Sequence, residues 1–491
     1  MRDVTQPPPE PQPRASVGPA WTVVDWWALG GLLAVAAALR LVGLDQPHGF
    51  VFDEMFYAQN ACFSTLGGPA CGLDTLVSRA HPPLGNWLIG AGIALFGYGE
   101  FGWRIAPALA GVLGVGATFL LTRRLLRGWA PGAATGGALA AGGLLALDPL
   151  HLVMSRVAML DSFVTLFSVA TIGFAVMDAQ GARGRVGGRR RWRLAAGLAL
   201  GAAVAVKWSG AYAGIGALAL ILLAEAAARR RDGEGRRAGF CRALRDEWGS
   251  LLVSLGLVPV LVYLGSYIGF AHGSVLALPW QEGSWWREVA GHQVAMLRFH
   301  LGLEGSHPYE SPVWSWLLLK RPVAFWFAAS GGTYREVLAL GNPVAWCAGV
   351  AGLLGVVVAA RRDPRFRTVA MVAGVGAAAT FLPWLVLSGS RSQVFIWYVL
   401  PTIPFLYIGL GACVAWAWKR GLGRAALGVA AAAVLAWFAF FWPMLTAQPL
   451  SPGEWRDRIW FSDCARPGAS TLELPDDEIN QGPPPSGWCW I

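Results

Sequence analysis

Two adjacent carboxylates, Asp53 and Glu54, are the first candidates for chemistry in this sequence. They follow Phe52 and lie a few residues beyond the first apolar segment, Trp26 to Leu44. Charged groups at the edge of a membrane-embedded protein are costly unless they are solvated or used, so an acidic pair here is a functional-site hypothesis. The alternative is a pair of solvated loop carboxylates without a chemical role.

Four isolated cations lie at the ends of apolar segments on the same side as this pair. Arg104 starts the second segment, Arg156 opens the fourth, Lys207 separates the fifth from the sixth, and Arg391 precedes the tenth. Each one alone is explained by a side chain that snorkels to the membrane surface. Four together predict a shared anion, and a lipid phosphate is the natural candidate, because Arg and Lys bind phosphate oxygens by charge-assisted hydrogen bonds.

Histidines and a glutamine mark two further polar segments on that side. His81 precedes an apolar run that ends at Phe96, which we expect to be a helix lying on the membrane surface. Gln293, His300 and His307 alternate with aromatic residues in a later segment, which fits a carbohydrate or phosphate pocket. Their spacing does not match a metal site, so we expect no metal ligands here.

These residues belong to a chain with the composition of a membrane protein. Of its 491 residues 55% are hydrophobic and 14% are charged. A helix needs about 20 apolar residues to cross a bilayer. The sequence predicts an all-α polytopic protein with eleven such spans, at about 26–44, 104–122, 132–148, 157–177, 194–208, 209–226, 250–270, 343–360, 367–387, 395–418 and 425–443.

Basic clusters predict the orientation, because Arg and Lys concentrate in cytoplasmic loops. With eleven spans, five basic clusters fall on the side of the N-terminus. They lie at residues 123–127, 183–193, 229–245, 361–367 and 419–424. We therefore expect a cytoplasmic N-terminus and an extracytoplasmic C-terminus in the cell membrane. The net charge of +10 is explained by topology. We expect membrane lipids as neighbours and no nucleic acid.

The expected domain organisation follows from these spans. Residues 1–20 are proline-rich and are predicted to be a disordered cytoplasmic tail. Residues 21–445 form the membrane domain, with long outer loops at 45–103 and 271–342, and residues 446–491 form an outer tail. Cys62 and Cys71 share the first outer loop, and Cys464 and Cys489 share the tail. Since disulfides persist on that side of a membrane, each couple is a candidate pair, and four free thiols are the alternative.

The ordered set of motifs resembles the protein O-mannosyltransferase family, in its shorter bacterial branch typified by actinobacteria. The matching segments run in family order from about residue 40 to 445. They are Phe52-Asp53-Glu54, His81-Pro82-Pro83-Leu84-Gly85, Arg104, Ser155-Arg156 to Asp161-Ser162, Val206-Lys207-Trp208-Ser209-Gly210, His307-Pro308-Tyr309, and Phe395 to Pro404, which includes Tyr398.

The resemblance implies the GT-C membrane glycosyltransferase fold and one particular transfer reaction. Members of the family move mannose from a polyprenyl-phosphate-mannose donor to Ser or Thr hydroxyls of exported proteins. Two departures are visible in this chain. The loop 271–342 has no room for the β-trefoil MIR domain of eukaryotic members. Asn86 stands where many relatives have a lysine, so a phosphate role for this position is not carried over.

The resemblance also suggests roles for residues. We expect Asp53 to be the general base for the acceptor hydroxyl, with Glu54 holding the acceptor backbone or sugar hydroxyls. We expect the donor phosphate and sugar to be bound by His81, Arg104, Arg156, Asp161, Lys207, Gln293, His300, His307, Arg391 and Tyr398. No cofactor and no metal are expected, and the displacement inverts the anomeric centre. Expected partners are the lipid-linked donor and Ser/Thr-rich exported proteins, with the Sec translocon as a further candidate.

Two other functions compete with this one. A GT-C transferase with a lipid or cell-wall glycan acceptor would use the same donor chemistry, so the acceptor groove alone separates it. A transporter would need polar residues and broken helices near mid-bilayer, with an internal repeat. The polar residues here lie at one face and no inverted repeat is visible, which disfavours transport.

Overall fold

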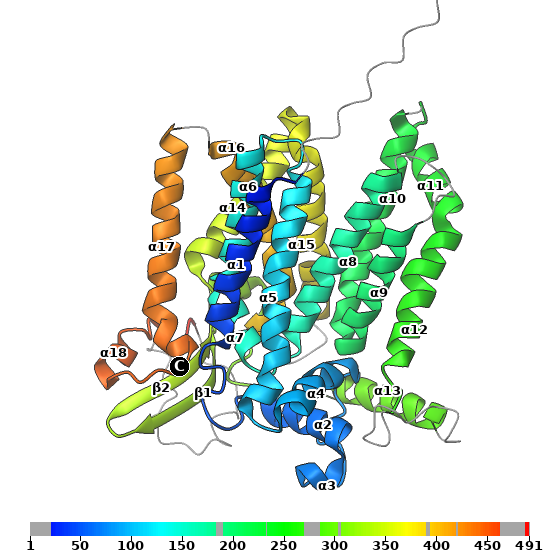
Figure 1. Cartoon of the computed structure of the whole chain (residues 1–491). Helices are drawn as coiled ribbons and strands as arrows, with labels where there is room; N and C mark the ends of the chain where they lie inside the picture. Colours follow the sequence, from blue (N-terminus) through cyan, green and yellow to red (C-terminus); the bar gives the residue numbers. More distant parts are fainter. Residues whose placement is uncertain are drawn as a thin grey trace, which may run out of the picture.

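The protein is a bundle of long helices with shorter elements gathered at one end. The computed structural model describes residues 21–182, 190–231, 233–269, 285–302, 306–388, 393–418, 421–461 and 487–490. In Figure 1 the long helices stand roughly upright, and the short helices and a β-hairpin lie across their lower end.

Nine helical segments of the described chain are long and apolar enough to cross a membrane. They comprise α1 (Val23–Leu41), α5 (Glu100–Leu125), α8 (Asp161–Ala182), α10 (Ala211–Arg231), α11 (Arg236–Leu251) continued through the π-helix η2 (Leu252–Leu257) into α12 (Val258–Gly265), α14 (Pro343–Arg362), α15 (Arg367–Leu387), η6 (Ile396–Thr402) continued into α16 (Ile403–Ala417), and α17 (Gly421–Leu445). The expected polytopic helical architecture is therefore confirmed.

Two of the eleven expected spans have a different form. The third is a pair of helices, α6 (Pro131–Ala146) and α7 (Pro149–Arg156), bent by 57°. The break lies at Asp148-Pro149, where proline has no N–H to continue a helix and the Asp148 carboxylate accepts from the His151 N–H at 2.9 Å. The fifth is α9 (Arg191–Val206), which has only 16 residues and packs beside α8 and α12.

The break moves one candidate residue to another element. We expected Arg156 to open the fourth span, but it is the last residue of α7, and α8 starts at Asp161.

Helices pack closely elsewhere in the bundle. A side chain at Gly137 of α6 would meet the backbone of Gly411 in α16, and the reverse also holds, so glycine permits this approach of two backbones.

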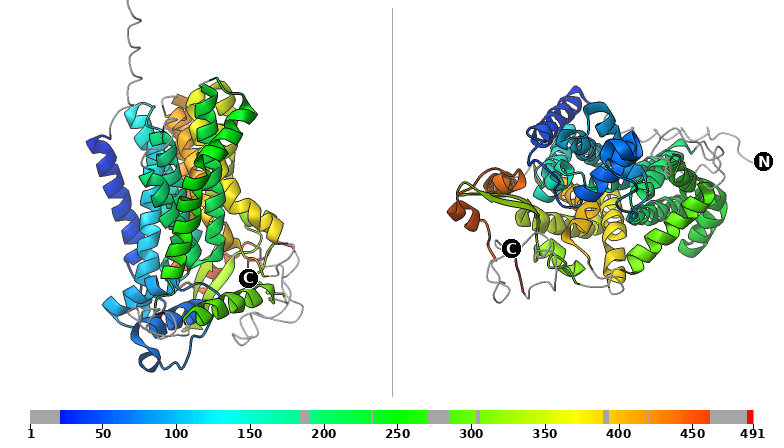
Figure 2. Two further views of the ribbon diagram at one scale, coloured as in Figure 1. Left: turned by 90° about the vertical axis from the view of Figure 1, so that its right-hand side faces the viewer. Right: turned by 90° about the horizontal axis from the view of Figure 1, so that it is seen from below.

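Short elements cover the lower end of the bundle. They are α2 (Glu54–Leu66), α3 (Gly68–Cys71), α4 (Leu84–Phe96), α13 (Trp285–Leu301), the 3-10 helix η4 (Val313–Leu318), β1 (Val323–Ser330), β2 (Thr333–Ala339) and α18 (Pro452–Arg456). Helices α2, α4 and α13 lie across the bundle axis (Figures 1 and 2), so the expected helix over 84–96 is present. They belong to the two loops that we assigned to the outer side.

The β-hairpin is the one departure from an all-α fold in the described chain. Strands β1 and β2 are antiparallel and are joined at Gly331-Gly332, whose φ angles of 57° and 74° fit a two-residue hairpin turn. Tyr334 of β2 forms a further antiparallel bridge with Leu450. From the sequence we expected only a long outer loop over residues 271–342, without strands.

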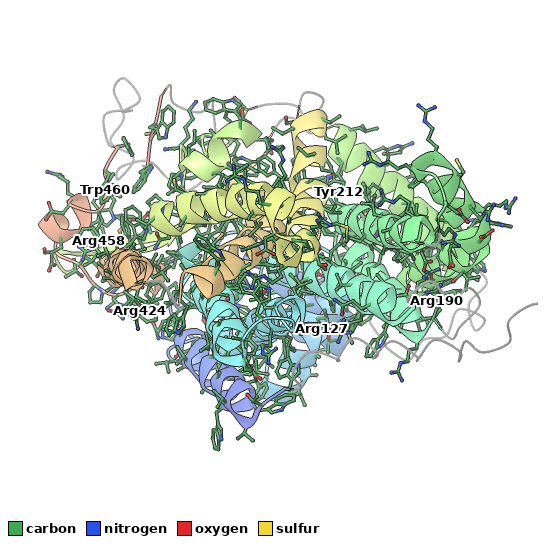
Figure 3. The ribbon with its side chains drawn as sticks, turned by 90° about the horizontal axis from the view of Figure 1, so that it is seen from above. Arg127, Arg190, Tyr212, Arg424, Arg458 and Trp460 are labelled. Atoms are coloured by element: carbon green, nitrogen blue, oxygen red, sulfur yellow. A yellow bond between two sulfur atoms is a disulfide. The ribbon has the colours of Figure 1, made fainter. Side chains whose placement is uncertain are left out.

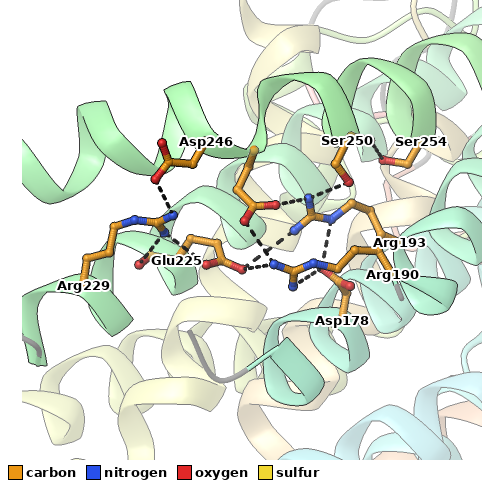
Figure 4. Close-up of polar contacts among 9 residues, drawn as sticks. Asp178, Arg190, Arg193, Glu225, Arg229, Asp246, Ser250 and Ser254 are labelled. Atoms are coloured by element: carbon orange, nitrogen blue, oxygen red, sulfur yellow. Dashed lines mark hydrogen bonds and ion pairs between the residues drawn. The ribbon is translucent and has the colours of Figure 1, made fainter. Parts of the chain in front are cut away.

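The opposite end of the bundle carries the basic residues. Figure 3 shows Arg127, Arg190 and Arg424 spread across the bundle in the view from above. A buried ion-pair network fastens α11 to α8, α9 and α10 there (Figure 4). Its members are Asp178, Arg190, Arg193, Glu225, Arg229, Asp246 and Glu247. Arg193 alone bonds Asp178 at 3.0 Å and Glu247 at 2.7 Å. These arginines therefore hold helices together in addition to marking topology.

Candidate active site

Glu54 is the buried structural centre of the first loop. Arg104 binds both of its carboxylate oxygens, Nε to Oε1 and Nη2 to Oε2, each at 2.8 Å. The N–H groups of Val51 and Ala158 donate to the same carboxylate at 2.9 and 2.8 Å. Neither Glu54 nor Arg104 exposes its side chain. Protein donors thus occupy the Glu54 oxygens in this structure, and the expected contact of Glu54 with acceptor groups stays a prediction.

Arg104 is likewise bound to protein oxygens. Besides Glu54, its terminal nitrogens donate to the carbonyls of Leu44, Pro47 and Gly49 at 2.8–3.3 Å. All five N–H groups of this guanidinium thus have partners within the protein. Arg104 therefore ties α5 to the first loop, and the phosphate role expected for it stays a prediction.

Arg156 caps the end of α1. Its guanidinium donates to the carbonyls of Leu39, Arg40, Val42 and Gly43 at 2.7–3.0 Å. A cation at a helix C-terminus bonds the last carbonyls and complements the helix dipole. Arg156 is buried among these groups, and its expected phosphate contact stays a prediction.

Asp53 differs from Glu54 in burial and in its hydrogen-bond partners. It lies at the N-cap of α2, is partly buried, and accepts a hydrogen bond from the Tyr57 hydroxyl at 3.4 Å. The pKa of the Asp53 carboxyl is raised to about 6 in all. Burial is the main cause and the charge of Asp161 adds to it, while Lys207 and the hydrogen bond from Tyr57 act in the opposite direction. A carboxylate with its pKa near neutrality and few protein donors is suited to accept a proton.

The backbone before Asp53 is held in an unusual conformation. Phe52 has φ of 51°, the left-handed region that costs a non-glycine residue about 1–3 kcal/mol. Its ring stacks on Phe325 of β1, with centroids 4.6 Å apart, and meets Trp397 of η6 edge-on at 5.4 Å. Such strain clusters at functional sites. Here it sets the direction of the backbone immediately before Asp53.

Lys207 and Asp161 form an ion pair beside Asp53. Lys207 follows α9, and its Nζ lies 3.0 Å from both carboxylate oxygens of Asp161, the first residue of α8. The ammonium also lies 4.8 Å from the centre of the Tyr398 ring, a cation–π contact. Both members of the ion pair are at least 90% buried, so an anion at this point would meet a weakly solvated cation.

A small pocket opens next to this ion pair. Its lining is rich in hydroxyl groups and aromatic rings, contributed by Asp161, Ser168, Ser209, Tyr212, Thr380, Trp384, Tyr398 and Pro401. The Trp384 and Tyr398 rings stack at 4.6 Å. Hydroxyls beside stacked aromatic rings suit a small polar group, and the space between them is about that of one water molecule.

His81, His300 and Gln293 each contact other residues of the protein. The His81 ring is 5.9 Å from that of Tyr57 and 5.7 Å from that of His300, whose Nε2 is 3.0 Å from the Ala80 carbonyl. Gln293 accepts from Tyr263 at 2.6 Å and links α13 to α12.

The last candidates are His307, Arg391 and Cys464. His307 accepts from the Tyr309 N–H at 3.1 Å and packs on the Phe395 ring at 5.1 Å. Arg391 lies outside the described residues, and so does Cys464. Within the described ranges, no group of three or more His, Cys, Asp or Glu side chains is arranged to hold a metal ion.

Cys62 and Cys71 form a disulfide bond, the pairing expected from their shared loop. The bond ties α2, which starts beside Asp53, to the end of α3. Cys489 is buried, and its N–H donates to the Lys320 carbonyl at 3.1 Å, while the proposed pairing with Cys464 involves an undescribed residue.

Several residues of the site were not found from the sequence. Tyr57 lies one helical turn after Asp53, and this i, i+4 spacing was the available signal. Phe325 comes from a strand that was not expected, so no sequence pattern linked it to Phe52.

Solved structures place this architecture in a known class. The chain aligns with the S. cerevisiae protein O-mannosyltransferase Pmt1-Pmt2 complex bound to the sugar donor, with a TM-score of 0.72, 15% identity, and coverage of 91% of this chain and 93% of that one. It also aligns with ArnT from Cupriavidus metallidurans bound to undecaprenyl phosphate, with a TM-score of 0.55, 23% identity, and coverage of 86% and 65%. The fold is that of the GT-C membrane glycosyltransferases.

Sequence comparisons define the family. Residues 80–233 match the profile of dolichyl-phosphate-mannose-protein mannosyltransferase, and residues 285–464 match the C-terminal four TMM region of protein-O-mannosyltransferase. The polyprenol-phosphate-mannose–protein mannosyltransferase of Mycobacterium tuberculosis is 31% identical over 92% of this chain and 96% of its own length. The enzyme of the same name from Corynebacterium glutamicum is 28% identical over 90% and 94%. The chain belongs to the protein O-mannosyltransferase family and is a mannosyltransferase.

Proposed function

We propose that this enzyme transfers mannose from a polyprenyl-phosphate-mannose donor to Ser or Thr hydroxyls of exported proteins, at the outer face of the membrane. The names of the M. tuberculosis and C. glutamicum relatives support the donor and the protein acceptor. The observation that carries the mechanism is the partly buried Asp53 carboxylate, with its raised pKa, beside the Lys207–Asp161 ion pair.

The proposed reaction is one displacement. The acceptor hydroxyl oxygen attacks the anomeric carbon of mannose while the bond from that carbon to the phosphate oxygen breaks. The hydroxyl proton passes to Asp53, and polyprenyl phosphate leaves as an anion. Because attack and departure occur on opposite faces, a β-linked donor gives an α-mannoside.

Lys207 supplies positive charge for the leaving group in this proposal. Asp161 and the ring of Tyr398 hold its ammonium at a fixed point, so little reorganisation is needed when phosphate charge develops. The arginines at 104 and 156 take no direct part, because they bind protein oxygens. With a fixed cation present, the displacement needs no metal ion.

A transferase with a lipid or glycan acceptor is the second candidate. An undecaprenyl phosphate-alpha-4-amino-4-deoxy-L-arabinose arabinosyl transferase of Pseudomonas fluorescens is 31% identical over 61% of this chain and 47% of its own length. That match supports polyprenyl-phosphate chemistry without specifying the acceptor. The mannosyltransferase relatives, which match over nine-tenths of the chain, favour the protein acceptor.

An assay with purified protein in lipid nanodiscs tests the proposal. It combines polyprenyl phospho-[³H]mannose, a Ser/Thr-rich peptide and a chelator of divalent cations. The proposal expects label in the peptide, released as α-mannose. Label in an added lipid or glycan with none in the peptide would favour the second candidate, and a requirement for added metal would contradict the metal-free mechanism.

A further inference from the structure

The β-hairpin has one occupied edge and one open edge. Strand β2 packs against α7, α17 and α18, and its outer edge pairs with Leu450 through Tyr334. Among the described residues, β1 has no second strand, and no backbone hydrogen bond reaches its outer edge. An edge strand of this kind presents N–H and C=O groups to any extended chain beside it.

The register identifies the groups that β1 offers. The Tyr334 N–H and C=O bond Leu450 at 2.8 and 2.9 Å, so both point away from β1. Ala329 is the partner of Tyr334 in the antiparallel ladder, so its N–H and C=O also point outward. The same holds for Phe327, two residues earlier, which pairs with Glu336. These two residues present two N–H and two C=O groups spaced for another strand, and a bulge between Ala324 and Trp326 ends the regular alternation beyond them.

The same strand leads to the proposed base. Phe325 is buried and stacks on Phe52, the residue before Asp53, with the two rings 6° from parallel. The Ala329 end of β1 is exposed, and exposure falls toward Phe325. A chain lying along β1 would therefore run from solvent toward Asp53.

We propose that the acceptor polypeptide binds as a third strand on the open edge of β1. Binding there presents a Ser or Thr hydroxyl of the acceptor to Asp53. This inference rests on the proposed function and specifies how the acceptor is held. An unfolded exported chain has free backbone groups, and strand addition recognises these with little dependence on side chains. Binding of this kind accepts many sequences that contain Ser or Thr.

Backbone methylation of the acceptor tests the inference. A set of Ser/Thr peptides, each carrying one N-methyl group at a successive position, removes one N–H at a time. Since a strand pairs every second residue with its neighbour, KM should rise about tenfold at alternate positions and stay within about twofold at the positions between, with kcat little changed. Transfer with no such alternation would overturn the inference alone. Absence of transfer to the unmethylated peptide would overturn the proposed function and the inference with it.

A pair of variants provides the matching test on the enzyme. Ala329→Pro removes one outward N–H without breaking the β1–β2 ladder, and proline is tolerated on an edge strand. Ala329→Ser retains the N–H and is the control. Ala329→Pro should raise the peptide KM about fivefold and leave the donor KM unchanged, with Ala329→Ser like the parent enzyme. Equal peptide KM values for the two variants, with equal melting temperatures, would overturn the inference.

Discussion

Glu54 and Arg104 form a fully buried, bidentate ion pair in which both nitrogen–oxygen distances are 2.8 Å. The pair joins the start of α2 to α5, and the Ala158 N–H extends it to the segment before α8. Asp53, adjacent in sequence, has a Tyr57 hydroxyl as its hydrogen-bond donor and stands beside Lys207. The acidic motif therefore divides into a carboxylate that ties helices together and the carboxylate that we propose as the base.

Glu54→Ala is expected to destabilise the protein. It leaves the Arg104 charge buried without its partner, a change that typically costs about 3–5 kcal/mol. Thermal unfolding in detergent should show a clearly lower melting temperature, with Asp53→Asn close to the parent protein as the control. A Glu54→Ala protein with the parental melting temperature and no activity would instead give Glu54 a direct chemical role.

The pH dependence should report the raised pKa of Asp53. The base must be ionised to accept a proton, so kcat/KM should fall as pH drops through about 6 and stay level above it. Tyr57→Phe removes a hydrogen bond that favours the ionised form and should move the inflection to higher pH. An inflection near the ordinary aspartate value, about 4, would mean that another group limits the rate.

Sequence patterns were sufficient for the parts of this fold that depend on local runs of residues. Apolar runs predict the spanning helices, because a helix in lipid satisfies its own backbone. The break at Asp148-Pro149 was missed, since both halves are apolar and a proline alone does not specify a bend. The hairpin at β1–β2 was missed because its strands lie in a long loop with no clean alternation.

The candidate site was harder to predict than the fold, because its residues meet across long sequence distances. Arg104 and Lys207 are both isolated cations, and nothing local distinguishes them. Arg104 has its carboxylate 50 positions earlier, and Lys207 has Asp161 46 positions earlier. Helix packing decides which cation pairs with Glu54 and which lies beside the proposed base, and a single sequence does not specify this packing.

Lys207→Ala and Arg156→Ala should therefore behave differently. Loss of Lys207 removes the cation assigned to the leaving phosphate, so kcat should fall by about 10²-fold or more and donor KM should rise. It also leaves the Asp161 carboxylate buried without its partner, so the melting temperature should fall as well. Loss of Arg156 uncaps α1, so the melting temperature should fall. Measurement of both kinetic constants and melting curves separates the two, and a stable Arg156→Ala enzyme with a selective donor defect would restore the phosphate role.

The Cys62–Cys71 disulfide should stabilise the segment that carries Asp53. Replacement of both cysteines by serine should lower the stability by about 2–4 kcal/mol, as is typical for a disulfide. Mass spectrometry of non-reduced peptides should detect the linked pair. Alkylation of both thiols without prior reduction would contradict the bond.

The most direct test of the account is the initial rate of mannose transfer by Asp53→Asn. The assay uses radiolabelled polyprenyl phosphomannose, a Ser/Thr-rich peptide and enzyme of verified melting temperature. Asparagine keeps the shape of the side chain but cannot accept the proton. The account predicts a rate lower by about 10²-fold or more with donor binding retained. A folded Asp53→Asn enzyme that keeps most of the parental rate would contradict it.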